Sequence, residues 1–349
     1  MRFYLHFCNK YGHQPGDLGS LPLFIAKLAS KGQTVEQQAE AQRAIGYYRA
    51  PLSPSIEPRG KAQSETMNEE TWKKAIEDYS TKELSQRKAW YSGVAAVYDR
   101  LRPGYSSTLI DQVLEITQLS PGSNLLEIGA GPGTATVSFA PLGCSMLCLE
   151  PNSDFYQLAQ RNCQAYPNVK IHNTSFEEWE LEPEEFDAIL SATAFHWIPA
   201  EIRFLKAAQA LRDRGYLILL WNTGLEPEPE IQAELQNIYQ DYVPDFVPYE
   251  GLATQQQHLQ SFGQMILDSG YFQNLVSQAY VCTAHYAITD YLLLLSTYSP
   301  YLNLETQARE ALFASLKTKL EQQGPGQIKL YYLSAFHIAE KVYSCHGSS

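Results

Sequence analysis

A glycine-rich turn between two regular segments constrains the fold of this chain most. Residues 124–128, Asn-Leu-Leu-Glu-Ile, have the composition of a buried strand, and residues 134–140 favour a helix. Between them lies Gly-Ala-Gly-Pro-Gly at 129–133. Glycines at alternate positions remove side chains from the turn, so we expect backbone amides and a helix N-terminus to approach a nucleotide-like ligand. Glu150 ends the next apolar run, 145–149, where a carboxylate can accept hydrogen bonds from ribose hydroxyls.

The glycine spacing separates two ligand classes. The dinucleotide fingerprint G-x-G-x-x-G needs a glycine where this chain has Thr134, which disfavours a pyrophosphate ligand and a Rossmann oxidoreductase. Residues 125–134, Leu-Leu-Glu-Ile-Gly-Ala-Gly-Pro-Gly-Thr, resemble the first motif of class I S-adenosylmethionine-dependent methyltransferases. The resemblance extends over about residues 90–342. In that family the acid before the turn, here Glu127, lies under the charged methionine end of the methyl donor.

The resemblance implies an α/β fold. We expect a seven-stranded, mainly parallel, doubly wound sheet whose last strand is antiparallel, with the ligand over the carboxyl ends of the strands. The sequence predicts the further strands at 169–173, 186–190, 216–222, 276–287 and 327–339. Largely helical insertions at about 226–270 and 289–323 lie where the family grows its substrate lid.

A proline-rich segment divides the chain near its N-terminus. Three prolines between positions 51 and 58 forbid a continuous helix. We expect helices at 21–28 and 35–48, and the following parts: a small all-α unit over 1–50, a linker over 51–66, a helical connector over 67–89, the methyltransferase domain over 90–342 and a tail over 343–349. Residues 3–84 also resemble the N-terminal helical part of integron-type tyrosine recombinases, an accessory helical cap being the alternative. That family's nucleophilic tyrosine and paired arginines have no counterpart here, so recombinase activity is not expected.

The resemblance assigns the donor site to residues from several loops: Arg102, Glu127, Gly129, Ala130, Gly131, Gly133, Thr134, Glu150, Pro151, Asn152, Ser175, Phe176, Glu177 and Ala192. It implies that Arg102 approaches the donor's carboxylate, for which a guanidinium has suitable geometry. It also implies that Phe176 packs on the adenine and that Glu177 or the nearby backbone accepts from the adenine amino group. The alternatives are an ordinary surface arginine and a capped turn with one buried aromatic residue.

The segment 191–197 bears on the acceptor. Amino-methylating DNA enzymes of this superfamily carry an acid or amide, two prolines and an aromatic residue here, and this chain does not. Its Phe-His-Trp at 195–197 instead resembles methyltransferases of small molecules, including those that esterify small carboxylic acids. The candidate catalytic residues are His196 and Tyr298, and the candidate pocket residues are Trp197, Trp221 and Tyr298. The alternatives are a structural histidine and a tyrosine packed in the core.

We therefore expect in-line methyl transfer from S-adenosylmethionine to a small-molecule acceptor, a carboxylate or another oxygen nucleophile. A donor-binding protein without turnover is one alternative. A DNA-directed methyltransferase guided by the N-terminal helical unit is another, although a net charge of −12 over 349 residues disfavours a nucleic-acid partner.

Composition leads to expectations about location and metals. The six cysteines lack the paired spacing of a metal site, which predicts free thiols and no metal. The chain has no run of about 18 apolar residues, and its N-terminus lacks the pattern of a signal peptide. We therefore expect a cytoplasmic protein without a membrane partner. The sequence does not indicate an oligomeric state.

Overall fold

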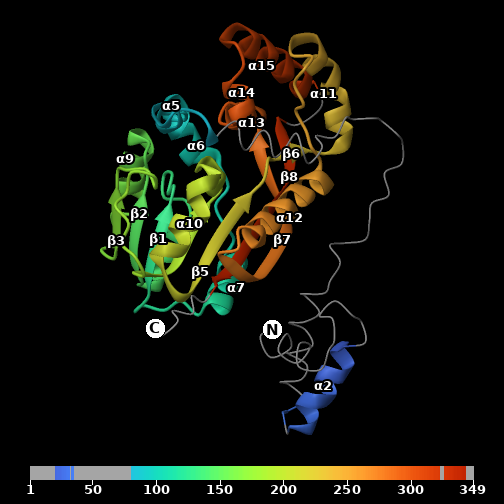
Figure 1. Ribbon diagram of the computed structural model, residues 1–349. Coiled ribbons are helices and arrows are strands. Elements are labelled where there is room, and N and C mark those ends of the chain that lie inside the picture. Colours follow the sequence, from blue (N-terminus) through green and yellow to red (C-terminus); the bar gives the residue numbers. More distant parts are fainter. Residues whose placement is uncertain (1–19, 32, 35–79, 323–325, 343–349) are drawn as a thin grey trace. The chain divides into compact units, whose positions relative to one another are not determined.

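The structure is a computed structural model that describes residues 20–31, 33–34, 80–322 and 326–342 (Figure 1). The chain divides into two units, 1–64 and 65–349. In the first unit the described residues form helix α2 (Ser20–Ser30), which contains the expected helix at 21–28. The expected helix at 35–48, the linker and most of the connector lie outside the described residues, so the N-terminal domain boundaries stay predictions.

The second unit is built on an eight-stranded sheet (Figure 1). Its strands are β1 (Asn124–Ile128), β2 (Ser145–Leu149), β3 (Val169–His172), β4 (Phe186–Ala192), β5 (Leu211–Asn222), β6 (Glu226–Pro227), β7 (Phe272–Ala287) and β8 (Gln327–Lys341). The order is β3-β2-β1-β4-β5-β8-β6, and β7 pairs with β8. Strands β1 to β5 pair in parallel, whereas β8 is antiparallel to β5, β6 and β7. The expected doubly wound sheet with an antiparallel last strand is confirmed. The two-residue β6 is an addition that periodicity could not indicate.

The helices that the structure describes in this unit precede the sheet, connect most of its parallel strands and then form the insertions. They are α5 (Leu84–Ala89), α6 (Ala95–Leu101), α7 (Ser107–Thr117), α8 (Thr136–Phe139), α9 (Ser153–Asn162), α10 (Ala200–Ala210), α11 (Pro229–Tyr242), α12 (Leu252–Asp268), α13 (Ile288–Leu295), α14 (Ser299–Leu302) and α15 (Thr306–Glu321). Three short 3₁₀ turns are η1 (Ser92–Val94), η2 (Ala140–Leu142) and η3 (Phe195–Trp197). Within the described ranges, no helix is long and apolar enough to cross a membrane.

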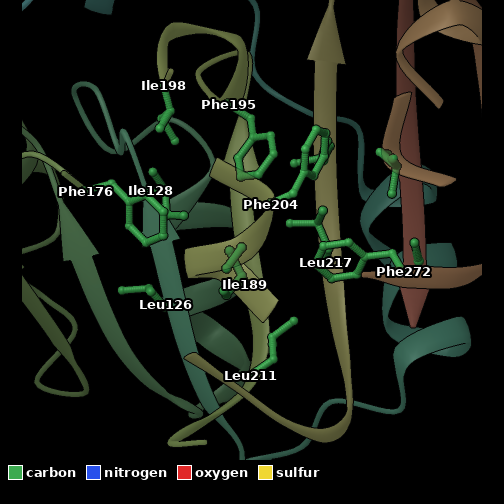
Figure 2. Packing of buried hydrophobic residues seen from close by; sticks show 14 of the residues in the cluster. Leu126, Ile128, Phe176, Ile189, Phe195, Ile198, Phe204, Leu211, Leu217 and Phe272 are labelled. Carbon is green, nitrogen blue, oxygen red and sulfur yellow. The ribbon is translucent and has the colours of Figure 1, made fainter. Parts of the chain in front are cut away.

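Both faces of the sheet are covered, because alternate strand residues point to opposite sides. On one face Leu126, Ile189 and Leu217 pack with Phe204 of α10 in a single apolar cluster (Figure 2). On the other face Leu125 belongs to a second cluster that α7 and α8 complete. Burying an aliphatic or aromatic side chain of this size contributes about 1.5–3 kcal/mol, so the two clusters hold the strand ends at fixed positions.

A third apolar cluster joins most of the inserted helices to one end of β8. It contains side chains from α11, α13, α14 and α15 together with Ile328 and Leu330. Helix α12 differs, since Leu259, Phe262 and Ile266 belong to the cluster on the sheet face. The insertion expected at 226–270 therefore separates into α11, which joins the helical cluster, and α12, which serves as a layer of the core rather than as part of a lid.

Candidate active site

A pocket lies over the carboxyl ends of strands β1, β2, β4 and β5. It is lined by residues drawn from the segments 128–135, 150–152, 192–198 and 222–225, each of which follows or ends one of these strands. Parallel strands end at the same edge of a sheet, so loops that are far apart in sequence meet there. The loop after β3 and residues between 84 and 105 complete most of the wall.

Glycine is needed at the three positions of the turn for different structural reasons. A Cβ on Gly131, which has φ +58° and lines the pocket, would meet no atom within 4 Å. A Cβ on Gly129 would lie 2.6 Å from the Cβ of Ala194, and one on Gly133 would lie 3.1 Å from the sulfur of Cys163. Gly131 therefore keeps space in the pocket, while the other two glycines allow close packing of the protein against itself.

The amides of the turn are bonded within the protein. The N–H groups of Gly129 and Ala130 donate to the Leu149 carbonyl, at 2.9 and 3.1 Å, and the Gly131 N–H donates to Glu150 at 2.7 Å. The helix expected at 134–140 is a single turn, α8, followed by the 3₁₀ turn η2. The turn thus differs from the expectation that its backbone amides approach the ligand, because Leu149 and Glu150 supply the acceptors for the amides of residues 129–131.

Glu150 is a buried residue of the pocket wall. Its two carboxylate oxygens accept from the Gly131 N–H and from the Asn152 N–H, each at 2.7 Å, so the glycine turn and the start of α9 are tied together. Burial raises the pKa of Glu150 to about 7, although both hydrogen bonds favour the charged form. Asn152 also caps the next helix, α9, by accepting from the N–H groups of Asp154 and Phe155.

Glu127 lies beneath the pocket rather than in its wall. It is fully buried, and its Oε2 accepts from the hydroxyl of Thr136 at 2.6 Å and from the thiol of Cys148 at 3.5 Å. Oε1 has no hydrogen-bond partner among the described residues. Burial raises the pKa of Glu127 to about 7, and the neighbouring Glu150 charge adds to the rise.

The loop after β3 closes one end of the pocket. Phe176 is buried and stacks on Trp179, with ring centroids 6.0 Å apart and an interplanar angle of 14°, so most of its ring faces the core (Figure 2). Lys206 donates to the carbonyls of Phe176 and Trp179, at 2.7 and 2.6 Å, and fixes the loop to α10. The Glu177 carboxylate accepts from Arg87 at 2.5 Å.

The segment around α5 contributes Leu84, Arg87 and Lys88 to the pocket wall, which sequence reasoning missed. A single nitrogen of Arg87, Nη1, donates to Glu177 and, at 2.8 Å, to the carbonyl of Trp197, so α5 is tied to two loops of the pocket wall. Lys88 pairs with Glu178 at 2.6 Å. The only sequence signal was a basic pair ahead of the Trp-Tyr at 90–91, and its acidic partners stand 90 positions further along the chain.

Arg102 lines the pocket in a fixed orientation. Its Nε donates to Oγ1 of Thr297 and its Nη2 donates to the Thr297 carbonyl, both at 2.9 Å. The guanidinium carbon lies 3.7 Å from the ring centroid of Tyr298 and 4.9 Å from that of Tyr98. Pro103 disfavours a helical conformation for the residue before it, which ends α6 at Leu101 and turns Arg102 toward the insertion.

The candidate catalytic residues occupy different positions. His196 lines the pocket, but its Nδ1 is buried and has no partner among the described residues. Burial lowers the pKa of His196 to about 4, with a smaller effect from the nearby charge of Arg203, so the ring is neutral at pH 7. The structure places Tyr298 behind the wall, where its hydroxyl accepts from the Leu225 N–H at 3.0 Å. Trp221 lies behind His196, with its ring 4.6 Å from that of Phe262 in the core.

Most of the residues expected in the site meet at the pocket. Those that line it are Arg102, Gly129, Ala130, Gly131, Thr134, Glu150, Pro151, Asn152, Ser175, Phe176, Glu177, Ala192, His196 and Trp197. Four do not line it: Glu127, Gly133, Trp221 and Tyr298. Among the residues that the structure describes, no group of three or more His, Cys, Asp or Glu side chains could hold a metal ion.

Comparisons with known proteins agree with this geometry. A family model described as a methyltransferase domain matches residues 125–215, from β1 into β5. The chain is 24% identical over 253 residues to an uncharacterized methyltransferase-like protein of Schizosaccharomyces pombe, a match that covers 70% of this chain and 93% of that protein. It is 25% identical over 152 residues to a probable S-adenosylmethionine-dependent methyltransferase of Saccharomyces cerevisiae, covering 42% of this chain and 51% of the yeast protein.

A solved structure agrees at the level of the fold. A proposed type II methyltransferase from Anaeromyxobacter dehalogenans superimposes with a TM-score of 0.51 at 18% identity, covering 68% of this chain and 97% of that one. The strand order, the glycine turn with its two acids, the methyltransferase-domain match and the named relatives together identify the chain as a class I S-adenosylmethionine-dependent methyltransferase.

Proposed function

We propose that this enzyme transfers the methyl group of S-adenosylmethionine to an oxygen atom of a small molecule, with a carboxylate as the preferred acceptor. The observation that carries the proposal is the meeting of an open space beside Gly131 with the buried carboxylate of Glu150 at the edge where the strands end. A side chain at 131 would enter that space, so its shape fits a ligand that touches the turn closely.

The donor end is proposed to lie along the loops after β1, β2 and β3. The bound donor supplies an already activated methyl group on a positively charged sulfur. Glu150 has a free lone pair on each oxygen and would accept from ribose hydroxyls, while Arg102 would pair with the donor's carboxylate. The loop that contains Ser175 and Glu177 would bound the adenine, with Arg87 holding Glu177 in place. Glu127, buried beneath the turn, would act on the donor's charge from a distance.

The acceptor end is proposed to lie near Trp197. The pocket wall there includes Thr223, Ser299 and the aromatic ring of Trp197, and the carboxylates in the wall are those of Glu150 and Glu177. The Glu177 carboxylate lies near Trp197, because Nη1 of Arg87 donates to both residues. Arg87 already neutralises that carboxylate, so a cationic amine would find no uncompensated negative charge on the described residues of this end, which favours a neutral or anionic acceptor. An acceptor carboxylate is ionised at pH 7 and needs no base, in agreement with a neutral His196 that offers at most a hydrogen bond.

The size of the acceptor is limited by the cover over the pocket. Arg87 and Asn152 attach the segment around α5 to the loops that line the pocket, since the Asn152 side chain donates to the Lys88 carbonyl at 2.7 Å, and we propose that this segment covers the bound ligands. A polymer would have to displace this cover, whereas a small molecule fits beneath it. Catalysis then consists of holding the acceptor oxygen in line with the methyl group and excluding water.

Calorimetric titration of S-adenosylhomocysteine into the wild-type chain and two glycine variants tests the donor site. We expect wild-type binding of about −5 to −8 kcal/mol. Gly131→Ala should abolish most of the heat. Gly270→Ala is the matched control, because Gly270 also has a positive φ (+74°) and open surroundings but lies outside the pocket. Equal binding by Gly131→Ala and wild type would refute the donor site.

The acceptor is tested separately by mass spectrometry. A metabolite extract incubated with the enzyme and methyl-labelled donor should give labelled small molecules, and labelled esters would support a carboxylate acceptor because alkali releases their label. Label found only on amines would contradict the acceptor class. Donor binding without any labelled product would favour a donor-binding protein without turnover.

A further inference from the structure

We propose that Thr297, which precedes α14 in the second insertion, is a positioning residue that holds Arg102 ready for the carboxylate of the bound methyl donor. This inference rests on the proposed donor site. Thr297 is 195 positions from Arg102 and is absent from the pocket wall, so it would act through the arginine rather than on the donor itself.

The hydrogen bonds use one edge of the guanidinium. Nε donates to the Thr297 hydroxyl oxygen and Nη2 donates to the Thr297 carbonyl, so the Nε/Nη2 edge is filled by one residue. Among the described residues Nη1 makes no hydrogen bond, and the edge formed by Nη1 and Nη2 is the one that can bind a carboxylate with two parallel hydrogen bonds. Filling one edge therefore determines which edge is offered to a ligand.

Thr297 is itself held in place by the end of α13. It is fully buried, and its hydroxyl donates to the Leu294 carbonyl at 2.7 Å. With its hydrogen directed there, Oγ1 presents its lone pairs to Arg102. Its own N–H donates to the same carbonyl at 3.0 Å, which fixes the backbone as well.

Two tyrosines prevent the arginine from rotating out of this arrangement. The ring of Tyr298 lies 3.7 Å from the guanidinium carbon, and the ring of Tyr98 lies 4.9 Å from it. The Tyr298 hydroxyl accepts from the Leu225 N–H, so that ring cannot move without breaking a bond to the loop after β5. The role of Tyr298 in this arrangement is to stack on the arginine, not to contact substrate.

The test compares two ligands on three proteins. S-Adenosylhomocysteine carries the amino-acid carboxylate, and 5′-methylthioadenosine lacks it. Thr297→Val removes the hydroxyl acceptor and keeps the shape and the backbone carbonyl, while Thr297→Ser keeps the hydroxyl. We expect the Kd of S-adenosylhomocysteine to rise about tenfold in Thr297→Val and to stay within about twofold of wild type in Thr297→Ser. The Kd of 5′-methylthioadenosine should be unchanged in both variants.

A double variant tests whether Thr297 acts through Arg102. In an Arg102→Gln background, Thr297→Val should cause no further loss of S-adenosylhomocysteine affinity, because the residue that it positions is absent. An unchanged Kd in Thr297→Val, or equal losses for both ligands, would overturn the proposal. Failure of the wild type to bind either ligand would instead refute the donor site on which the inference depends.

Discussion

We predict that donor binding depends on pH through Glu150, because of the surroundings of its carboxylate. Burial raises the pKa of Glu150 to about 7. Ribose hydroxyls would donate to the ionised carboxylate, so protonation of Glu150 competes with donor binding. Affinity is therefore full well above pH 7 and falls as the pH drops through about 7.

The magnitude follows from the ionised fraction. A group with a pKa of about 7 is about 90% ionised at pH 8 and about 10% ionised at pH 6. The Kd of S-adenosylhomocysteine should therefore rise about tenfold between pH 8 and pH 6, or about 1.4 kcal/mol. Glu150→Gln cannot titrate, and its amide places an N–H group against one of the two backbone donors. This variant should bind about tenfold more weakly at pH 8 and show no step around pH 7.

Calorimetry at pH 6, 7 and 8 measures both proteins. Glu127→Gln is the matched control, since the pKa of Glu127 is also raised to about 7 but its side chain lies outside the pocket wall. The Kd of S-adenosylhomocysteine for Glu127→Gln should still change around pH 7. A wild-type affinity that does not change with pH, or the same step in Glu150→Gln, would refute the assignment of Glu150 to the ribose.

Three further outcomes follow from the geometry. Gly129→Ala should lower the free energy of unfolding in urea by about 2–4 kcal/mol, because the new Cβ would lie 2.6 Å from that of Ala194 at a φ of +68°. Arg87→Ala should raise the dissociation rate of S-adenosylhomocysteine in stopped-flow displacement roughly five- to thirtyfold, whereas Lys88→Ala, which removes a more exposed ion pair, should stay within about twofold. Burial lowers the pKa of His337 to about 4, so its contribution to stability is present above about pH 6.5 and is lost as the pH falls through 4. In His337→Phe, the decrease in the free energy of unfolding on acidification should be about 3 kcal/mol smaller than in the wild type. An unchanged dependence of this free energy on pH would contradict the prediction.

The parts of the fold that depend on local pattern could be predicted from the sequence. Strand β1 follows from a mostly apolar run, and the Asn152 cap of α9 follows from residue type. The turn at 129–133 indicated the pocket because glycine is needed there for conformation and space. These features depend on residues close together in the chain.

The remaining parts depend on contacts between distant residues. The Arg87–Glu177 pair joins residues 90 positions apart, and no periodicity distinguishes it from an exposed charge on a helix. Helix α12 has an apolar face that suits either a lid or a core layer, and only the position of β7 and β8 decides between them. The pairing of Arg102 with Thr297 is likewise visible only after folding, when α13 ends beside α6.

A crystal structure with S-adenosylhomocysteine tests the central claim most directly. The ligand should lie over the carboxyl ends of the strands. It should contact Gly131, and its ribose hydroxyls should lie within hydrogen-bond distance of Glu150. Clear density for the ligand at any other place, or a pocket that stays empty at a saturating ligand concentration, would contradict the account.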